Sequence, residues 1–313
     1  MAYPILHHSH TLIPHSLELA GETPALPGIE LTTRGGFPSI SPVTTTHNAL
    51  ALDGKKIVVI GGTGGIGLSA VKAFIAGGAC VVAVGLEREE VPPVARQFGQ
   101  TVRFIHADAT QPETAPRAIE ECVATFGGFH GLYHVAGGSG RRWGDGPLHE
   151  ISNEGWRLTL ELNLTSVFYS NRAAVREVLA KARGGCVLNL SSVLAFSPSG
   201  QHFATHSYAA AKSAIIGLTK SCASRYAANH IRFNVLAPGL VQTPMAQRAA
   251  GDPGIMAFIK TKQPLDGGRI GKASDLDAAA VFFMSDAAHF TTGQVLAVDG
   301  GWSVTEGLSP AAS

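Results

Sequence analysis

The stretch that decides the fold consists of three consecutive segments: Lys56-Ile-Val-Val-Ile60, Gly61-Gly-Thr-Gly-Gly-Ile-Gly67 and Leu68-Ser-Ala-Val-Lys-Ala-Phe-Ile75. The first is an apolar run of strand length, and the third has apolar residues at helical spacing. Strand, glycine turn and helix in this order are typical of the phosphate-binding unit of a doubly wound α/β fold. The sequence therefore predicts that this turn holds a dinucleotide.

The residue types in the turn suit that purpose. Gly61 and Gly65 permit a sharp turn and a close approach of backbone to a pyrophosphate, and Gly67 lets the helix pack on the sheet. The amino terminus of the helix adds N–H donors and a positive dipole. A glycine-rich turn alone is weak evidence, because flexible loops also collect glycine. We expect the cofactor to contact Gly61, Thr63, Gly64, Gly65, Ile66 and Gly67.

Outward from this unit, apolar runs of strand length alternate with helical patterns. The further expected strands are 80–84, 102–106, 131–135, 186–190, 231–236 and 294–298. Such alternation predicts an α/β fold with a mostly parallel, seven-stranded, doubly wound sheet and helices on both faces. We expect one domain over residues 51–307. Residues 1–50 show neither helical nor strand periodicity, which predicts a disordered extension. We expect residues 308–313 to form a short tail.

Composition narrows the function classes. The 24 basic and 23 acidic residues leave a net charge of +1. The sequence contains no basic run of the kind that binds nucleic acid or an anionic membrane surface. No apolar run reaches the length of a spanning helix. The four cysteines lie far apart, without metal-site spacing, which fits core thiols in a reducing compartment. We expect a cytoplasmic protein with a small-molecule partner and no metal.

The ends of the second and third strands bear on the choice of dinucleotide. A carboxylate after the second strand would bind the ribose of NAD, and an arginine the 2′-phosphate of NADP. Gly85 stands where that carboxylate would be, and Arg88 has the chemistry for the phosphate, but Glu87 and two further glutamates surround it. NAD and NADP both stay open. Asp108, followed by Ala109, is expected to contact adenine, with a simple turn residue as the alternative.

A second group of residues carries the chemistry. Ser191 and Ser192 follow the strand at 186–190, and Tyr208 and Lys212 lie four residues apart on one helix face. Carbonyl reduction needs a proton donor at the developing alkoxide, and a tyrosine serves when nearby positive charge favours its ionised form. A Tyr and Lys pair is common in ordinary helices. Here the Tyr208 and Lys212 pair follows a serine at the end of a strand, and this position in the fold favours a catalytic role.

These features together resemble the short-chain dehydrogenase/reductase family in its compact single-domain form, over about residues 52–307. The ordered matches are the glycine turn at 61–67, Asp108, Val135-Ala-Gly-Gly138, Asn163, Ser192, Tyr208-x-x-x-Lys212, Asn234-Val-Leu-Ala-Pro-Gly239 with Thr243, and Val298-Asp-Gly-Gly301.

The resemblance implies a role for each matching residue. Tyr208 is then the general acid in reduction and the base in oxidation, and Ser192 holds the substrate oxygen, with Ser191 as the alternative. Lys212 binds the nicotinamide ribose and lowers the pKa of Tyr208, and Asn163 takes part in a proton relay. The remaining contacts to NAD or NADP are expected from Ala136, Gly137, Pro238, Gly239, Val241 and Thr243.

The resemblance also implies an oxidoreductase that interconverts a carbonyl and a secondary alcohol, assembled as a homotetramer or homodimer. An imine or enoyl reductase and a cofactor-binding sensor without turnover remain as alternatives. His134-Val135 replaces the usual pair of Asn. The substrate is expected against the loop after Gly138, the 197–206 insertion and residues 244–270. In the first of these, Arg141-Arg142 would suit a carboxylate or phosphate, or else be solvated or form a subunit contact.

Overall fold

Seven parallel strands form the centre of the computed structural model, which describes residues 51–86 and 97–307. The strands are β1 (Lys56–Ile60), β2 (Cys80–Gly85), β3 (Val102–His106), β4 (Gly131–His134), β5 (Gly185–Leu190), β6 (Ile231–Pro238) and β7 (Val295–Val298). Every strand expected from the sequence is present. The predicted extension 1–50, the tail 308–313 and Arg88 lie outside the described residues.

The sheet has the order β3-β2-β1-β4-β5-β6-β7, and every pairing is parallel. The chain winds outward from β1 in one direction through β2 and β3, then returns to the other side of β1 and continues through β4. The order therefore reverses beside β1, where open α/β sheets bind their ligands. The predicted doubly wound fold is confirmed.

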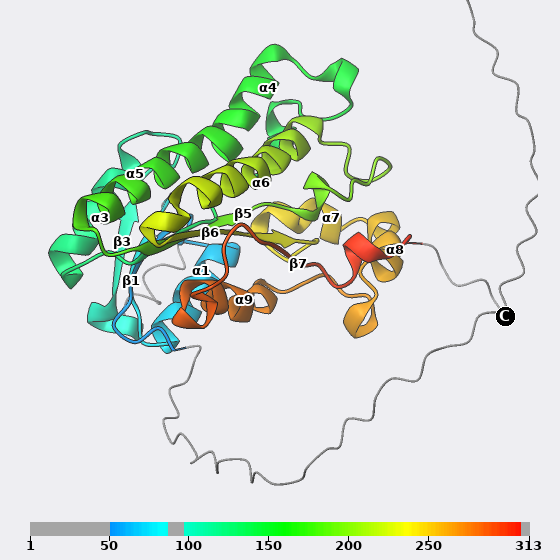
Figure 1. Ribbon diagram of the computed structural model, residues 1–313. Coiled ribbons are helices and arrows are strands. Elements are labelled where there is room, and N and C mark those ends of the chain that lie inside the picture. Colours follow the sequence, from blue (N-terminus) through cyan, green and yellow to red (C-terminus); the bar gives the residue numbers. More distant parts are fainter. Residues whose placement is uncertain (1–50, 87–96, 308–313) are drawn as a thin grey trace, which may run out of the picture. The chain divides into compact units, whose positions relative to one another are not determined.

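Helices cover both faces of the sheet (Figure 1). The helices α1 (Gly65–Ala76) and α9 (Asp277–Met284) pack on one face. The other face is covered by α3 (Thr114–Phe126), α5 (Ser166–Lys181) and α6 (His206–Tyr226). Three shorter helices complete the described chain: α4 (Asn153–Leu160), α7 (Gln247–Ala250) and α8 (Pro253–Lys262).

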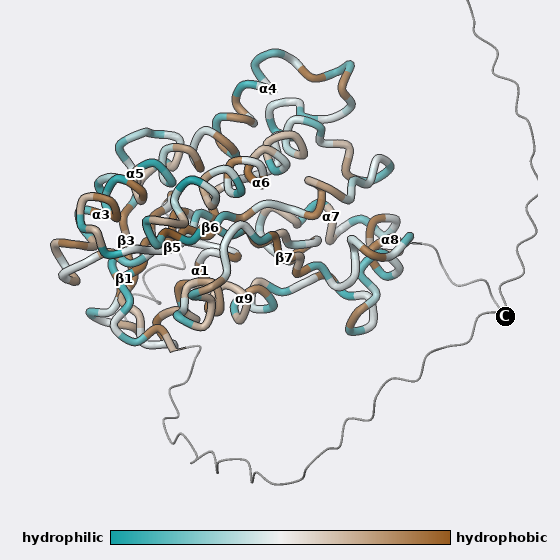
Figure 2. Tube along the Cα trace, viewed as in Figure 1, coloured by the Kyte–Doolittle hydropathy of each residue, from teal (hydrophilic) through white to brown (hydrophobic). Residues whose placement is uncertain are grey.

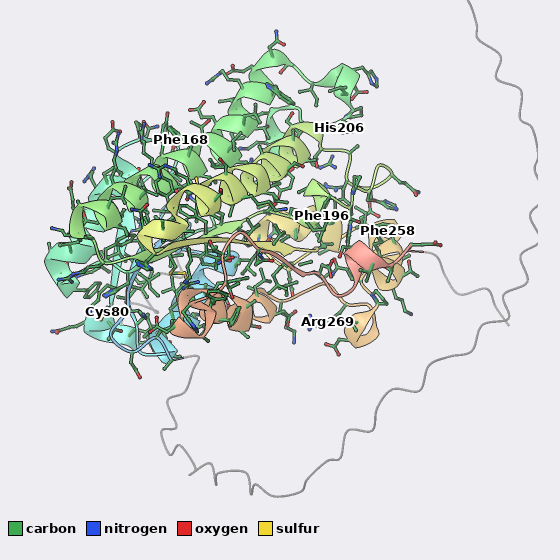
Figure 3. The ribbon with its side chains drawn as sticks, in the orientation of Figure 1. Cys80, Phe168, Phe196, His206, Phe258 and Arg269 are labelled. Atoms are coloured by element: carbon green, nitrogen blue, oxygen red, sulfur yellow. The ribbon has the colours of Figure 1, made fainter. Side chains whose placement is uncertain are left out.

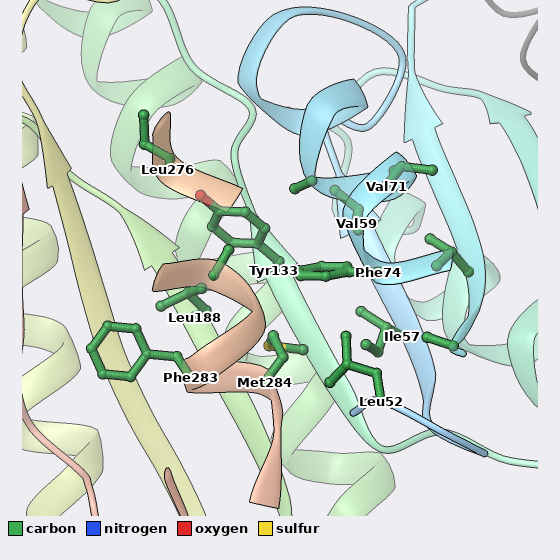
Figure 4. Close-up of a cluster of buried hydrophobic side chains, with 14 of the residues drawn as sticks. Leu52, Ile57, Val59, Val71, Phe74, Tyr133, Leu188, Leu276, Phe283 and Met284 are labelled. Carbon is green, nitrogen blue, oxygen red and sulfur yellow. The ribbon is translucent and has the colours of Figure 1, made fainter. Parts of the chain in front are cut away.

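Alternate residues of β1 enter two separate cores, which explains its unbroken apolar run. Ile57 and Val59 belong to the core under α1 and α9, whereas Val58 and Ile60 belong to the core under α3 and α5. In the first core, the rings of Phe74 and Tyr133 lie 6.2 Å apart (Figure 4). Hydrophilic residues gather on outer turns of the covering helices (Figure 2). The rigid sheet fixes the strand ends that build the site.

Within residues 51–86 and 97–307, no helix combines the length and apolar character that crossing a membrane requires. In the same part of the chain, His, Cys, Asp and Glu side chains form no group of three placed to hold a metal ion.

Candidate active site

The glycine turn between β1 and α1 is packed too closely for side chains. Gly61 has φ of 89°, and a Cβ built on it would lie 2.5 Å from the backbone nitrogen of Ala136. A Cβ on Gly67 would lie 2.0 Å from the carbonyl oxygen of Gly61. These two glycines are therefore required by the fold, because the turn passes directly against the end of β4 and against the first turn of α1.

The amino terminus of α1 fits an anionic cofactor. Its cap, Gly64, has no side chain to accept the first N–H groups, and the first helical turn contains no acidic residue. The N–H donors and the positive end of the helix dipole thus remain available to a pyrophosphate. Thr243 closes the other side of the turn, with its Cγ2 3.4 Å from the Cβ position of Gly65. The residues present fit NAD or NADP.

The side chain of Thr63 points away from a ligand. It is buried, and its hydroxyl donates to the carbonyl oxygen of Leu86 at 3.1 Å. A Cβ on Gly85 would lie 2.2 Å from that hydroxyl oxygen. Gly85 therefore has a packing role at the end of β2 in addition to the electrostatic one expected from the sequence. Only the backbone of Thr63 remains for a phosphate.

Asp108 forms a turn at the end of β3. Its Oδ1 accepts hydrogen bonds from the backbone N–H and the hydroxyl of Thr110, both at 2.9 Å. The turn interpretation is thus correct for one carboxylate oxygen. Contact of the other oxygen with adenine, and of Ala109 with the same ring, stays a prediction.

A cavity opens at the carboxyl ends of β4, β5 and β6. Many of the residues predicted for catalysis and for nicotinamide binding line it: Ile66, Gly137, Ser192, Tyr208, Lys212, Pro238, Gly239, Val241 and Thr243. All three segments expected to hold the substrate also contribute: Ser139, Arg141, Phe203, Thr205, Met245, Ala246, Arg248 and Ala249. Residues almost two hundred positions apart in the sequence thus meet around one space.

Tyr208 lies in the first turn of α6, and Asp145 holds that turn in place. The carboxylate of Asp145 accepts hydrogen bonds from the backbone N–H groups of Ser207 and Tyr208, each at 2.9 Å. Asp145 is 3% exposed, so this helix start is fixed from a distant loop. The helix cap itself, Thr205, supplies no side-chain hydrogen bond. Sequence reasoning did not identify Asp145, because its partner lies more than sixty residues away.

Burial shifts the pKa values of Tyr208 and Lys212. It raises the pKa of Tyr208 to about 12, and a hydrogen bond with Ser192 acts in the opposite direction. It lowers the pKa of Lys212 to about 7. Without cofactor, the loss of hydration of the phenolate thus outweighs the effect of the Ser192 hydrogen bond, and the lowering of the Tyr208 pKa by Lys212 stays a prediction.

The two serines after β5 have different partners. The hydroxyl of Ser191 donates to the carbonyl oxygen of Lys212 at 2.8 Å and so anchors α6 to the strand. Ser192 accepts a hydrogen bond from the backbone N–H of Leu194 at 3.2 Å, which leaves its own proton for another acceptor. Lys212 Nζ donates to the carbonyl oxygen of Leu190 at 2.9 Å. Of the two serines, Ser192 is thus the one that can donate to a substrate oxygen.

Asn163 lies in a π-helical segment, Glu161–Thr165, that joins α4 to α5. Its Oδ1 accepts from the backbone N–H of Gly138 at 3.0 Å, and its Nδ2 donates to the carbonyl oxygens of Gly138 and Thr159. A Cβ on Gly137 would lie 2.8 Å from Asn163 Oδ1 and 3.1 Å from Lys212 Nζ. Asn163 therefore lies beside Lys212 and fixes the loop after β4, although it does not line the cavity.

His134 replaces the amide expected near the end of β4 and connects that strand to α5. Its Nε2 lies 3.1 Å from the carbonyl oxygen of Ala136, and its Nδ1 lies 2.7 Å from the hydroxyl of Ser170. A carbonyl only accepts, so Nε2 carries the proton and Nδ1 accepts from Ser170. Burial, followed by the charge of Lys212, lowers the pKa of His134 to about 3. The ring is neutral.

Sequence reasoning missed part of the cavity wall. Met245 and Arg248, from the segment expected near the substrate, and Trp302, next to the Val298-Asp-Gly-Gly301 motif, received no site assignment from the sequence. Trp302 Nε1 donates to the carbonyl oxygen of Ser197 at 2.9 Å, so the segment after β7 packs against the 197–206 insertion. Conversely, Gly61, Thr63, Gly64, Gly65, Gly67, Asp108, Ala109 and Ala136 lie outside this cavity, at or near the ends of β1, β3 and β4.

Comparison with known proteins agrees with this geometry. A family model described as enoyl-(acyl carrier protein) reductase matches residues 61–303. A 2,5-dichloro-2,5-cyclohexadiene-1,4-diol dehydrogenase from Sphingobium indicum is 33% identical over 253 residues, which cover 80% of this chain and 98% of the relative. A 3-alpha-(or 20-beta)-hydroxysteroid dehydrogenase from Mycobacterium tuberculosis is 35% identical over 250 residues, or 80% of this chain and 90% of the relative.

Solved structures give the same result. The NADPH-dependent 3-quinuclidinone reductase from Rhodotorula rubra superposes with a TM-score of 0.75 at 28% identity, over 87% of this chain and 100% of its own. A gluconate 5-dehydrogenase from Burkholderia cenocepacia, in complex with NADP and tartrate, has a TM-score of 0.73 at 28% identity. The match covers 82% of this chain and 97% of the dehydrogenase. The chain thus belongs to the short-chain dehydrogenase/reductase family and is an NAD(P)-dependent oxidoreductase.

Proposed function

We propose that the chain interconverts a carbonyl and a secondary alcohol, with Tyr208 as the general acid in reduction and the general base in oxidation. The observation that carries the proposal is the meeting of Tyr208, Ser192 and Lys212 around one cavity at the strand ends. Bound NAD or NADP supplies or accepts the hydride. The protein's own residues position the substrate oxygen and move its proton.

Ser192 orients the substrate. Its hydroxyl, which hydrogen-bonds with Tyr208 in the protein alone, turns to donate to the carbonyl oxygen, and the same oxygen then lies within reach of the Tyr208 hydroxyl in the cavity. A proton on Tyr208 at neutral pH, supported by the raised pKa, suits the acid in reduction. The reverse reaction needs the phenolate, which added positive charge near Lys212 favours.

Lys212 binds the nicotinamide ribose and replenishes the proton through Asn163. Lys212 is 2% exposed and is held by Leu190, so its ammonium has a fixed direction. Both Nδ2 protons of Asn163 are used within the protein, but Oδ1 has a second lone pair for a water. That lone pair is the feature through which Asn163 takes part in a proton relay.

The phosphates and adenosine bind along the strand ends on the other side of β1. We assign the phosphates to Gly61, Thr63, Gly64, Gly65, Ile66 and Gly67 and the adenosine to Arg88, Asp108 and Ala109. Ala136, at the end of β4, is a further proposed contact to the cofactor. The uncapped amino terminus of α1 supports the phosphate position. The nicotinamide then contacts Gly137 and the segment Pro238, Gly239, Val241 and Thr243.

An enoyl or imine reductase is the second candidate, because the matching family model is described as an enoyl reductase. Ser192 beside Tyr208 favours a carbonyl oxygen as the acceptor. The dehydrogenase relatives also favour it: their names specify a cyclohexadiene diol and a hydroxysteroid. A sensor without turnover has no need of a serine hydroxyl hydrogen-bonded to a buried tyrosine at the cavity.

We further propose a homotetramer or homodimer packed through the helices that carry or adjoin Asn163 and Tyr208. Support comes from apolar side chains left exposed on these helices: Trp156 on α4 and Phe168 on α5. Figure 3 shows Phe168 on α5. A closed symmetric assembly would cover them. A cytoplasmic location is proposed only on the four free cysteines.

Fluorescence titration with NADH and NADPH, followed by turnover of a ketone and secondary-alcohol panel, tests the function. Tight binding of one cofactor with turnover of a panel member is expected. Reduction of an enoyl thioester or an imine, with every ketone unchanged, would favour the second candidate. Binding without turnover of any class would favour the sensor.

A further inference from the structure

Two arginines from separate segments line the same cavity as Tyr208. Arg141 lies in the short helical turn Gly140–Trp143 after β4, and Arg248 lies in α7 after β6. Both residues are exposed as a whole, so they lie where the cavity opens to solvent. A guanidinium offers five N–H donors in a fixed fork that matches a carboxylate or a phosphate.

The two guanidinium groups are electrostatic neighbours with little to neutralise them. Burial and the charge of Arg248 lower the pKa of Arg141, and Asp145 only partly opposes this. Both oxygens of Asp145 already accept hydrogen bonds from the start of α6. Among the ion pairs of residues 51–86 and 97–307, neither arginine takes part. The mouth of the cavity therefore carries excess positive charge.

The neighbouring Arg142 behaves differently and provides a control. Its guanidinium lies 4.0 Å from the centre of the Trp143 ring, in a cation–π contact, and the residue does not line the cavity. Of the Arg141-Arg142 pair that the sequence left open as an anion site, only Arg141 lines the cavity, and Arg248 lines it as well.

The rest of the wall on the substrate side is mostly apolar. Leu194, Phe203, Met245 and Trp302 line it, and the rings of Phe203 and Trp302 pack edge to face at 5.5 Å. Such a surface favours a hydrocarbon body. An apolar wall with two arginines at the rim of the cavity selects a ligand that is apolar over most of its surface and carries an anionic group.

We propose that the substrate has an apolar body and a single oxyanion, a carboxylate or a phosphate, which Arg141 and Arg248 bind while the reacting carbon faces Tyr208. This inference rests on the proposed function for the position of the reacting carbon. The anion site itself depends only on the two arginines and the cavity.

Equilibrium binding separates the two proposals because it needs no turnover. Calorimetry on the full chain with bound cofactor compares cyclohexanecarboxylate and cyclohexyl phosphate with neutral cyclohexanecarboxamide. We expect at least one anion to bind about tenfold more tightly than the amide, and the advantage to fall with added salt. Whichever of the two anions binds more tightly shows whether the site takes a carboxylate or a phosphate. Arg141→Gln and Arg248→Gln should each reduce the advantage, and Arg142→Gln should retain it.

Equal binding of anion and amide would overturn the inference, as would a preference that survives in the Arg141→Gln, Arg248→Gln double variant. No measurable binding of either anion at millimolar concentration would also overturn it. A second measurement compares kcat/KM for 4-oxocyclohexanecarboxylate with that for its methyl ester, where the acid should be preferred about tenfold. If anions bind through the arginines but no ketone or alcohol is turned over, the function fails and the anion site stands.

Discussion

The carboxylate of Asp145 accepts the backbone N–H of Tyr208 at 2.9 Å, so a loop between β4 and α4 fixes the residue on which the proposed chemistry depends. The interaction is buried and charge-assisted, and it replaces the missing cap of α6. Helix caps stabilise by about 0.5–2 kcal/mol. The same contact determines where the Tyr208 hydroxyl lies in the cavity.

Asp145→Ala should therefore lose both stability, by about 1–2 kcal/mol, and kcat, because the first turn of α6 loses its anchor. Urea unfolding and steady-state kinetics measure the two effects. Ser285→Ala is a matched control: it removes a hydrogen bond to the N–H of Ala287 near the start of β6, away from the cavity. The control should lose stability but not kcat. A normal kcat in Asp145→Ala would contradict the positioning role.

Tyr208→Phe should lower kcat by about 10²- to 10⁴-fold, the range of general acid–base catalysis. Affinity for the cofactor should be nearly unchanged, because the hydroxyl acts on the substrate proton. Single-turnover kinetics and fluorescence titration separate the two quantities. Ser191→Ala, which removes a contact to the Lys212 carbonyl, should affect stability more than chemistry. Retained turnover in Tyr208→Phe would remove this residue from the mechanism.

The stability of the protein without cofactor should rise with pH above neutrality because of Lys212. Its pKa is about 7 in the folded chain, below its ordinary value, so the unfolded chain binds more protons between these values. Stability then increases with pH from about 7 to 10.5, with a slope of up to about 1.4 kcal/mol per unit. Lys212→Met should flatten the rise in urea unfolding between pH 7 and 9. An equal slope in both proteins would contradict the burial of an uncharged lysine.

His134 should make the fold sensitive to acid. Its folded pKa of about 3 lies below the ordinary value of 6.5, so the unfolded chain takes up the proton first as pH falls. The contribution of His134 is fully present above about 6.5 and is lost progressively toward 3. His134→Asn keeps an acceptor for Ser170 without a titrating group, so its stability should depend less on pH in this range. Identical acid profiles would show that His134 is not the titrating group.

Gly85→Ala should weaken both folding and cofactor binding, because the added Cβ meets the buried Thr63 hydroxyl. Thr63→Ala removes that hydroxyl and should partly rescue Gly85→Ala. Contacting residues couple by about 0.5–3 kcal/mol, which a double-mutant cycle in urea can resolve. Gly200→Ala is a control for chain stiffness alone, because no atom lies within 4 Å of its Cβ position and its φ lies outside the left-handed region. If the changes in unfolding free energy of Gly85→Ala and Thr63→Ala simply add in the double variant, the contact between these two residues would be contradicted.

Much of the fold follows from local patterns in the sequence. Each strand of the sheet is a short apolar run, and β1 is apolar without interruption because its two faces enter separate cores. The glycine turn is recognisable because Gly61 and Gly67 have no room for a Cβ. Tyr208 and Lys212 are detectable from their spacing on one helix. These features leave a local pattern of residue types and spacing, which a sequence displays directly, even where the contact behind it, such as that of Gly61 with Ala136, is distant in the chain.

The remaining features depend on residues that only folding brings together. Asp145 reaches Tyr208, Trp302 closes over Ser197, and Arg248 joins Arg141 across the cavity, all between segments far apart in the chain. The acidity of Tyr208 and Lys212 likewise depends on burial, which is a property of the packed molecule. The sequence by itself determined the sheet, the glycine turn and the side chains of the proposed chemistry. Tertiary structure decided their protonation and the shape and charge of the substrate cavity, because desolvation and long-range contacts exist only after the strands are assembled.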